Sequence, residues 1–279
     1  MAIPKIIHYC WLSDEPYPEV VQYCIATWKK HMPNYEFRLW DQQQFDIHSV
    51  PWVEQAVKAK KWAFAADYIR LYALYNYGGI YLDSDVEVIK PFDDLLDLPY
   101  FLGKEHTRDF TDNIIEAATI GSSPNLPMFK DCLAYYENRS FVKGENIFDT
   151  TLIMPFVLYQ VINHNTAIKE ISKKEDFEKN NPAIQIFSPD FFSPKNLRTQ
   201  KIEATSNTYS IHYFNGSWLT PQQIKHIKMR TRLCNRYGER LGEISSSLFA
   251  LFSSVKIDGI KNTLKKLLEK IKFVFQSPK

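Results

Sequence analysis

The stretch from Ala65 to Val88 constrains the fold of this 279-residue chain more than any other segment. It contains an apolar helix pattern, a Gly-Gly pair, a short apolar run and two aspartates one residue apart. Gly78 and Gly79 supply the left-handed backbone that ends a helix, and residues 80–82 then predict a buried strand. Apolar residues before the glycines recur at three- and four-residue steps, which predicts one buried helix face. These residues are Phe64, Tyr68, Leu71, Leu74 and Tyr75.

The aspartates Asp83 and Asp85 fall where the predicted strand ends. Side chains alternate along a strand, so two carboxylates two positions apart point to one side and can converge on one hard cation. Without a cation, their mutual repulsion is expected to cost stability. A D-x-D triplet is common in solvated turns, but the carboxyl end of a strand is where α/β sheets bind ligands. This pair is therefore the first candidate site.

Strand and helix patterns alternate along most of the chain, which predicts an α/β domain with a mostly parallel sheet. Strands are expected at 3–12, 35–39, 80–82, 86–89, within 93–105, and at 113–120, 184–187 and 209–213. Helices are expected at 20–31, from 53 into the central segment, at 128–136 and within 148–162. Residues 169–181 are expected to form a polar surface stretch.

A change of composition near residue 222 predicts a main domain over 1–221 and a basic helical extension over 222–279. Within 256–275, an apolar stripe lies opposite several lysines. Two interpretations stay open for this helix: it packs on its own domain, or it lies on an anionic membrane surface. Nucleic acid is not an expected partner, because the lysines lack an aromatic or motif context.

The four cysteines are far apart and form no C-x-x-C pair, so neither a zinc site nor a disulfide framework is expected. The N-terminus has no signal-peptide pattern, and no run of about 18 apolar residues occurs in the chain. The expected location is cytoplasmic, with the basic helix allowing peripheral attachment to the inner face of the membrane.

The central segment resembles the DXD region of family 32 glycosyltransferases, which include capsular-polysaccharide and Golgi sugar transferases. The resemblance rests on A-A-D-Y-I-R (65–70) followed by L-Y-N-Y-G-G-I-Y-L-D-S-D-V (74–86). It extends to P-K-I-I-H-Y-C-W (4–11), to residues 27–40 and to H-Y-F-N-G-S-W (212–218). The core is also similar to that of the large clostridial glucosylating toxins. The tail lies outside the resemblance.

The resemblance implies a GT-A fold, a UDP- or GDP-sugar donor, a divalent cation (Mn²⁺ or Mg²⁺) and retention of anomeric configuration. It also implies that Asp85 binds the metal directly, while Asp83 contacts the ribose or sugar and the metal's waters. Asp67 and Arg70 would hold the transferred sugar. The alternative for this pair is an ion pair on a helix surface. Relatives often carry serine where this chain has Ala66, so a hydroxyl contact is missing.

Aromatic and histidine residues complete the implied site. Trp11 would stack on the base, with a core position as the alternative. Ser217 and Trp218 in the closing loop would cover the diphosphate. His212 would be a further metal ligand, and the alternative is a hydrogen-bonded core histidine.

Breaking a sugar–phosphate bond requires the departing diphosphate to be neutralised, which an oxygen-ligated cation does as a Lewis acid. Together with this chemistry, the resemblance implies a retaining glycosyltransferase that extends a glycan or lipid-linked acceptor, such as a cell-surface polysaccharide precursor, without a base catalyst. Two alternatives remain. LDSDVEV also resembles the aspartate motif of haloacid-dehalogenase-type phosphohydrolases that depend on Mg²⁺. The other alternative is a non-catalytic protein that binds nucleotide sugars.

Overall fold

The structure is a computed structural model, and it describes residues 2–106, 115–145, 147–150, 153–216, 221–247 and 249. The chain forms two compact units. The first comprises residues 1–196 and 202–218, and the second comprises 197–201 and 219–279.

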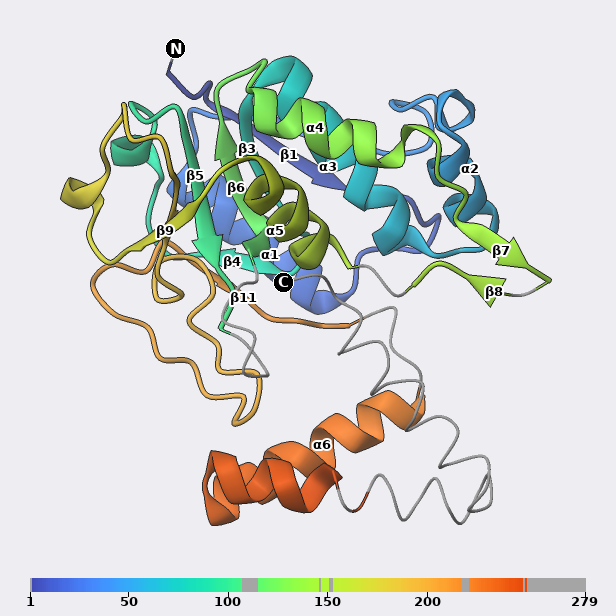
Figure 1. The fold of residues 1–279 in the computed structure, drawn as a ribbon, viewed down its shortest axis with the longest axis vertical. Coiled ribbons are helices and arrows are strands. Elements are labelled where there is room, and N and C mark those ends of the chain that lie inside the picture. The colour runs from blue at the N-terminus through green and yellow to red at the C-terminus, as the bar shows by residue number, and fades with distance from the viewer. Residues whose placement is uncertain are drawn as a thin grey trace. The chain divides into compact units, whose positions relative to one another are not determined.

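A seven-stranded sheet in the order β2-β1-β3-β6-β5-β10-β9 forms the centre of the first unit (Figure 1). Its strands are β1 (Ile6–Cys10), β2 (Glu36–Trp40), β3 (Gly79–Leu82), β5 (Tyr100–Lys104), β6 (Ile115–Ser122), β9 (Ile168–Ile171) and β10 (Ile184–Phe187). Neighbouring strands pair in parallel except at β6, which is antiparallel to both β3 and β5. The predicted α/β class with a mostly parallel sheet is confirmed.

Helices cover both faces of this sheet (Figure 1). They are α1 (Glu19–His31), α2 (Pro51–Lys58), α3 (Trp62–Tyr77), α4 (Pro127–Glu137) and α5 (Met154–Asn165). Helices α2 to α5 share one apolar cluster with Tyr81, whereas α1 shares the other with Ile80. Ile80 and Tyr81 are neighbours on β3, so the alternation of side chains along a strand assigns them to opposite layers.

Two small sheets complete the first unit. β4 (Val86–Val88) pairs antiparallel with β11 (Ser210–His212), and β7 (Val142–Gly144) pairs with β8 (Ile147–Phe148). Trp28 of α1 anchors the first of these sheets by donating its Nε1–H to the Val86 carbonyl at 2.6 Å. Short 3₁₀ turns lie at Ile47–Ser49, Asp93–Leu95 and Lys174–Asp176.

The glycine pair ends α3 as predicted. Gly78 has φ of 65° and Gly79 has φ of 100°, both in the region that favours glycine. A Cβ at Gly79 would lie 2.7 Å from the Ile6 carbonyl oxygen, so this position also needs the absence of a side chain. His8 secures the turn from β1, because its Nε2 lies 2.8 Å from the Gly78 carbonyl oxygen.

Two local expectations differ from the structure. The polar stretch 169–181 overlaps β9, an edge strand whose Lys169 and Glu170 are exposed, so its polarity concealed a strand. Helix α3 is buried on more sides than the predicted face, since Ala65, Asp67 and Ile69 are buried as well. That extra burial places charged side chains inside the domain.

The second unit contains α6 (Pro221–Tyr237), a turn at Gly238 and a further helical stretch over 239–247. The helical stretch approaches α6 so closely that a Cβ at Gly242 would lie 2.4 Å from the Cys234 Cα. Arg198 contributes ion pairs to Glu239 at 3.3 Å and Glu243 at 3.1 Å. The predicted amphipathic segment 256–275 lies outside the described residues.

None of the helices in the described part of the chain is both long and apolar enough to cross a lipid bilayer. All four cysteines are buried and unpaired.

His8 provides a prediction about stability. Burial lowers the pKa of His8 to about 4, although the hydrogen bond to Gly78 opposes this shift. An unfolded histidine titrates near about 6.5, so the unfolded chain binds one more proton between these two values. Stability should therefore fall as pH drops from about 6.5 to about 4, by about 3 kcal/mol in total from this residue.

We expect His8→Gln to remove this pH dependence. Urea unfolding at a series of pH values from 7.5 to 5 would measure it, because one extra bound proton changes the free energy of unfolding by about 1.4 kcal/mol per pH unit. Wild type and His8→Gln with equal pH slopes would contradict the assignment of a neutral buried imidazole.

Candidate active site

Asp83 and Asp85 lie in the turn between β3 and β4. The Asp83 N–H donates to the Ala118 carbonyl of β6 at 2.9 Å, and the Val86 N–H closes the turn on the Asp83 carbonyl at 3.0 Å. The prediction that strand alternation brings the carboxylates together was wrong, because both residues follow the strand. The turn directs them to one place instead.

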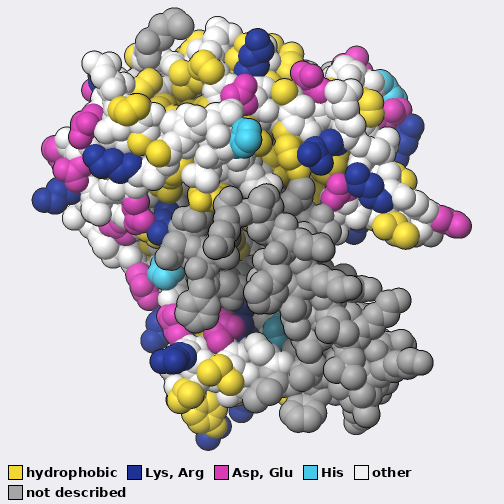
Figure 2. Space-filling view, in the orientation of Figure 1, with side chains coloured by type: hydrophobic (Ala, Val, Ile, Leu, Met, Phe, Trp, Pro, Cys, Tyr) yellow, Lys and Arg dark blue, Asp and Glu magenta, His cyan; other side chains and the backbone are white. Residues whose placement is uncertain are grey.

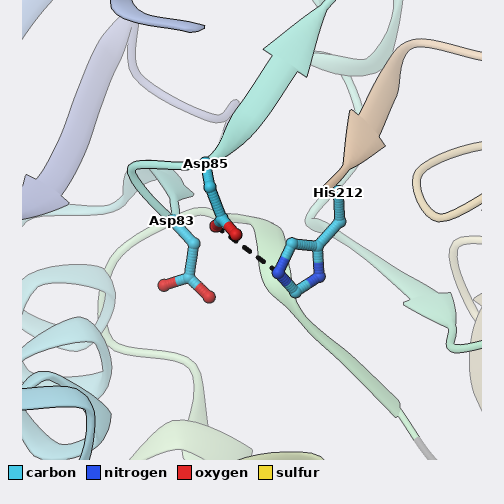
Figure 3. A group of neighbouring side chains, drawn as sticks. All are labelled: Asp83, Asp85 and His212. Carbon is cyan, nitrogen blue, oxygen red and sulfur yellow. Dashed lines mark ion pairs between the residues drawn. The ribbon is translucent and has the colours of Figure 1, made fainter. Parts of the chain in front are cut away.

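His212, at the end of β11, joins the two aspartates (Figure 3). One candidate ligand atom from each of Asp83, Asp85 and His212 lies within 4.8 Å of the others. The antiparallel pairing of His212 with Val86 carries the imidazole to this position. The structure thus brings together the three residues predicted to bind metal, from parts of the chain that are far apart in the sequence.

Asp85 and His212 form an ion pair. His212 Nε2 lies 3.5 Å from Asp85 Oδ1, and each side chain is 14% exposed. Burial opposes a charged imidazole, but Asp85 and Glu116 outweigh it and raise the pKa of His212 well above its usual value. Burial would likewise raise the pKa of Asp85, yet His212 and the Asn215 N–H, at 2.7 Å from Oδ2, hold it at about 2.

Asp67 and Arg70 lie inside the domain, so the alternative of a pair on the helix surface was wrong. Their side chains are 9% and 5% exposed. Arg70 Nη2 lies 3.1 Å from Asp67 Oδ1 and 3.2 Å from Asp83 Oδ1, while Nη1 donates to the Ala117 carbonyl at 2.5 Å. Arg70 therefore joins helix α3 to the turn that carries the D-x-D pair.

Each carboxylate of the D-x-D pair consequently has a cation of its own. Arg70 forms an ion pair with Asp83, and His212 forms one with Asp85. These two cations offset the expected repulsion between the carboxylates, although the charge of Asp85 still contributes to raising the pKa of Asp83. Burial raises the pKa of Asp83 despite Arg70, and burial also raises the pKa of Asp67 to about 7.

The structure places Trp11 directly after β1. Because β1 and β3 are parallel neighbours, Trp11 and Asp83 leave the sheet at the same edge. The Trp11 ring is half-buried, packs edge-on against Tyr17 at 5.0 Å and donates its Nε1–H to the Glu15 carbonyl. Stacking of Trp11 on a base stays a prediction. Ser217 and Trp218 lie outside the described residues.

Two residues of this region were missed from the sequence. Glu116 of β6 is 1% exposed, and its Oε1 lies 3.2 Å from His212 Nδ1. Lys195 is half-buried and donates its Nζ–H to the Tyr213 carbonyl at 2.6 Å. Burial lowers the pKa of Lys195, and the nearby Asp85 counteracts this. An acidic residue within an apolar strand was the available signal for Glu116, and Lys195 offered none.

The donor set fits a hard or borderline divalent cation. Two carboxylates and one imidazole suit Mn²⁺ or Mg²⁺, whereas thiolate ligands would favour softer metals. Further positive charge near the two aspartates is available from Arg70, which pairs with Asp83, and from Lys195, whose pKa the charge of Asp85 affects. The arrangement can bind a cation and stabilise negative charge that develops beside it.

Comparison with known proteins assigns a family resemblance to the same segment. Residues 18–102 match the family described as "Glycosyltransferase sugar-binding region containing DXD motif". This range includes Asp67, Arg70, Asp83 and Asp85.

Curated relatives carry glycosyltransferase names. Inositol phosphoceramide mannosyltransferase 3 of Schizosaccharomyces pombe is 32% identical over 118 residues, which are 41% of this chain and 33% of the relative. Mannosyl phosphorylinositol ceramide synthase SUR1 of Saccharomyces cerevisiae is 29% identical over 53% of this chain and 39% of its own length. The chain thus spans less than half of either protein. Uncharacterized glycosyltransferase L373 of Acanthamoeba polyphaga mimivirus is 25% identical over 77% of this chain and 84% of that protein.

Solved structures with a similar arrangement include the PaToxG glycosyltransferase, with a TM-score of 0.44 and 22% identity over 58% of this chain and 69% of that one. The galactosyltransferase LgtC, bound to donor and acceptor sugar analogues, has a TM-score of 0.37 and 12% identity over 83% of this chain and 95% of that one. Both likenesses are loose.

The ion pairs distinguish the two aspartates in a stability experiment. Asp85→Asn leaves the buried charge of His212 with a weaker partner, so we expect a loss of about 1–3 kcal/mol in the free energy of unfolding in EDTA. Asp83→Asn should cost less, because Arg70 keeps Asp67 and the Ala117 carbonyl as partners. Both variants should bind Mn²⁺ more weakly than wild type, as measured from the electron paramagnetic resonance signal of free Mn²⁺. Equal stability of Asp85→Asn and wild type in EDTA would contradict the pairing.

Proposed function

We propose that this chain is a metal-dependent, retaining glycosyltransferase of GT-A type that moves a hexose from a nucleotide sugar to a glycan or lipid-linked acceptor. The observation that carries the proposal is the convergence of Asp83, Asp85 and His212 at one edge of the sheet. The two aspartates belong to the segment that matches the DXD family. The α/β domain, with its mostly parallel sheet, supports the proposed GT-A fold.

In this proposal Asp85 and His212 hold the cation, with Asp83 as a further ligand directly or through water. The bound Mn²⁺ or Mg²⁺ supplies Lewis-acid stabilisation of the departing diphosphate. His212 gives up its Nε2 proton when it becomes a ligand, because a metal requires the imidazole lone pair.

Arg70 and Asp67 would orient the transferred sugar. Arg70 Nε is buried without a hydrogen-bond partner among the described residues, so this guanidinium keeps one donor for a ligand. Asp67, with its pKa raised to about 7 by burial, can donate or accept a hydrogen bond to a sugar hydroxyl. Neither residue is proposed as a base, since positioning and charge stabilisation suffice when the leaving phosphate accepts the proton.

Trp11, Ser217 and Trp218 are proposed to bind the nucleotide part of a UDP- or GDP-sugar. Trp11 leaves the sheet at the edge where the cation would hold the diphosphate, which supports a base-stacking role. The names of the yeast relatives refer to mannosyl transfer to inositol phosphoceramide, which supports a lipid-linked acceptor. A polysaccharide precursor at the cell surface is the second acceptor class.

The phosphohydrolase alternative has less support from the geometry. Its mechanism needs the first aspartate of the motif as a nucleophile. Asp83 Oδ1 instead accepts a hydrogen bond from the Tyr81 hydroxyl at 3.0 Å and lies 3.2 Å from Arg70, and both contacts reduce its nucleophilicity.

An assay of donor turnover across a Mn²⁺ titration tests the proposal. We expect hydrolysis or transfer that needs the metal, with a nucleoside diphosphate as product. Asp85→Asn should lower the rate at least about a hundredfold, because the metal supplies several kcal/mol of charge stabilisation and each 1.36 kcal/mol is about tenfold. Asp97→Asn is the matched control, since this side chain is 66% exposed and pairs with Lys179 at 3.7 Å, away from the D-x-D turn in the sequence.

Release of inorganic phosphate from sugar phosphates would favour the phosphohydrolase. A nucleotide sugar that binds but is never turned over, with any acceptor or water, would favour the non-catalytic alternative. Metal-independent turnover would overturn the role assigned to Asp83 and Asp85.

We also propose that the second unit docks on an anionic membrane surface, which would place the protein at the inner face of the cytoplasmic membrane. Exposed apolar side chains occur in and after α6, and Figure 2 shows such side chains beside Lys and Arg at the end of this unit. The exposed apolar side chains in and after α6 are Ile224, Tyr237, Leu241, Ile244 and Phe249. Arg236 and Arg240 are exposed among them. Apolar side chains flanked by arginine match a lipid interface rich in anionic headgroups. The apolar stripe and the lysines in the sequence of 256–275 support the same proposal.

Sedimentation with vesicles tests the docking proposal. The full chain should pellet with phosphatidylserine vesicles at low salt, and less with phosphatidylcholine vesicles or at high salt. Leu241→Glu with Ile244→Glu should reduce pelleting. Ile202→Glu is the control, because Ile202 is 45% exposed on the first unit. Pelleting that is insensitive to lipid charge, or to both substitutions on the second unit, would contradict the proposal.

A further inference from the structure

Glu116 is a buried acidic residue that the chemistry above does not use. It is 1% exposed on β6, where its neighbours Ile115 and Ala117 are 0% and 4% exposed. A carboxylate in such surroundings is costly unless it is paired and hydrogen-bonded. The partners of Glu116 should therefore indicate its role.

Glu116 uses one oxygen for two contacts. Its Oε1 accepts the Ala118 backbone N–H at 2.7 Å and lies 3.2 Å from His212 Nδ1. Its Oε2 is buried and has no hydrogen-bond partner among the described residues. The other nitrogen of His212, Nε2, faces Asp85. The imidazole ring thus lies between Glu116 on one side and the aspartate pair on the other.

A histidine that binds a metal through one ring nitrogen usually donates the N–H of the other to a carboxylate or carbonyl. This contact fixes which nitrogen carries the proton, orients the ring and makes the metal-binding nitrogen more basic. His212 Nδ1 is buried, forms no well-aligned hydrogen bond among the described residues, and lies 3.2 Å from Glu116 Oε1. The carboxylate is thus placed to become this partner, while Nε2 stays directed at Asp85.

Three consecutive residues of β6 support the whole site. Glu116 contacts His212, the Ala117 carbonyl accepts from Arg70, and the Ala118 carbonyl accepts from the Asp83 N–H. β6 lies in the middle of the sheet between β3 and β5, so it is a rigid support. Glu116 is the member of this strand whose side chain reaches the histidine.

We propose that Glu116 is the positioning residue of the metal site: it accepts a hydrogen bond from the Nδ1–H of His212 and so directs Nε2 toward a divalent cation held with Asp83 and Asp85. This inference rests on the proposed function, because it requires that the site binds a cation. A purely structural role, in which Glu116 only satisfies the Ala118 N–H, is the rival explanation.

The two explanations differ in how Glu116 and His212 combine. If Glu116 acts through His212, its substitution matters only while the imidazole is present. If Glu116 only supports β6, its substitution lowers stability and leaves the cation affinity of the folded protein unchanged. A double-mutant cycle on Mn²⁺ affinity separates these cases.

The experiment uses the full chain without donor and measures bound Mn²⁺ from the electron paramagnetic resonance signal of the free ion. We expect Glu116→Gln to weaken Mn²⁺ binding by about 10-fold or more, the usual effect of losing such an outer partner. His212→Gln should weaken it further, and the double variant should bind no more weakly than His212→Gln alone. Glu116→Asp, which withdraws the carboxylate by one methylene, should also weaken binding and serves if Glu116→Gln does not fold.

Thr119→Val is the matched control. It removes a buried side-chain contact from β6 to Ser210, at 3.2 Å, without touching His212. It should lower the melting temperature and leave Mn²⁺ affinity at the wild-type value. Wild-type affinity in folded Glu116→Gln and Glu116→Asp, or additive losses in the double variant, would overturn the positioning role alone. A wild-type protein that binds no Mn²⁺ would overturn both this inference and the metal-dependent function.

Discussion

The rest of the site depends on the contacts that the buried guanidinium of Arg70 makes. It is 5% exposed and holds together helix α3, strand β6 and the turn after β3, through Asp67, the Ala117 carbonyl and Asp83. Removing one partner of a buried ion pair typically costs about 3–5 kcal/mol, because the remaining charge stays desolvated. The same contacts therefore fix the position of Asp83 and the stability of the surrounding fold.

His212, whose pKa is raised well above its usual value, balances the charge of Asp85 and lies next to Glu116. Arg70 and His212 thus offset part of the repulsion among the carboxylates of the metal-free site. Binding a divalent cation replaces the imidazolium proton, so metal affinity should be coupled to proton release. The antiparallel strand β6 makes this balance possible, since it supplies the partners of both cations from adjacent residues.

Much of the local structure could be predicted from the sequence. The helix end at Gly78, the strand after it and the α/β class follow from backbone preferences and apolar periods, which depend on near neighbours. β9 could not be predicted in this way, because Lys169 and Glu170 face solvent at a sheet edge and give no apolar alternation. The residues Glu116 and Lys195 were missed because their importance depends on partners such as His212 and Tyr213, distant in the sequence.

The sequence by itself determined that a helix, a glycine turn and a strand deliver Asp83 and Asp85 to one edge of a sheet, because each step is set by local sterics and periodicity. Only the tertiary structure decided what surrounds them. The burial of Arg70, the approach of His212 from β11 and the contact of Glu116 with its imidazole arise from strand order. Strand order depends on the packing of the whole domain. Burial and close charges at the turn after β3 then shift the pKa values of Asp85 and His212 strongly.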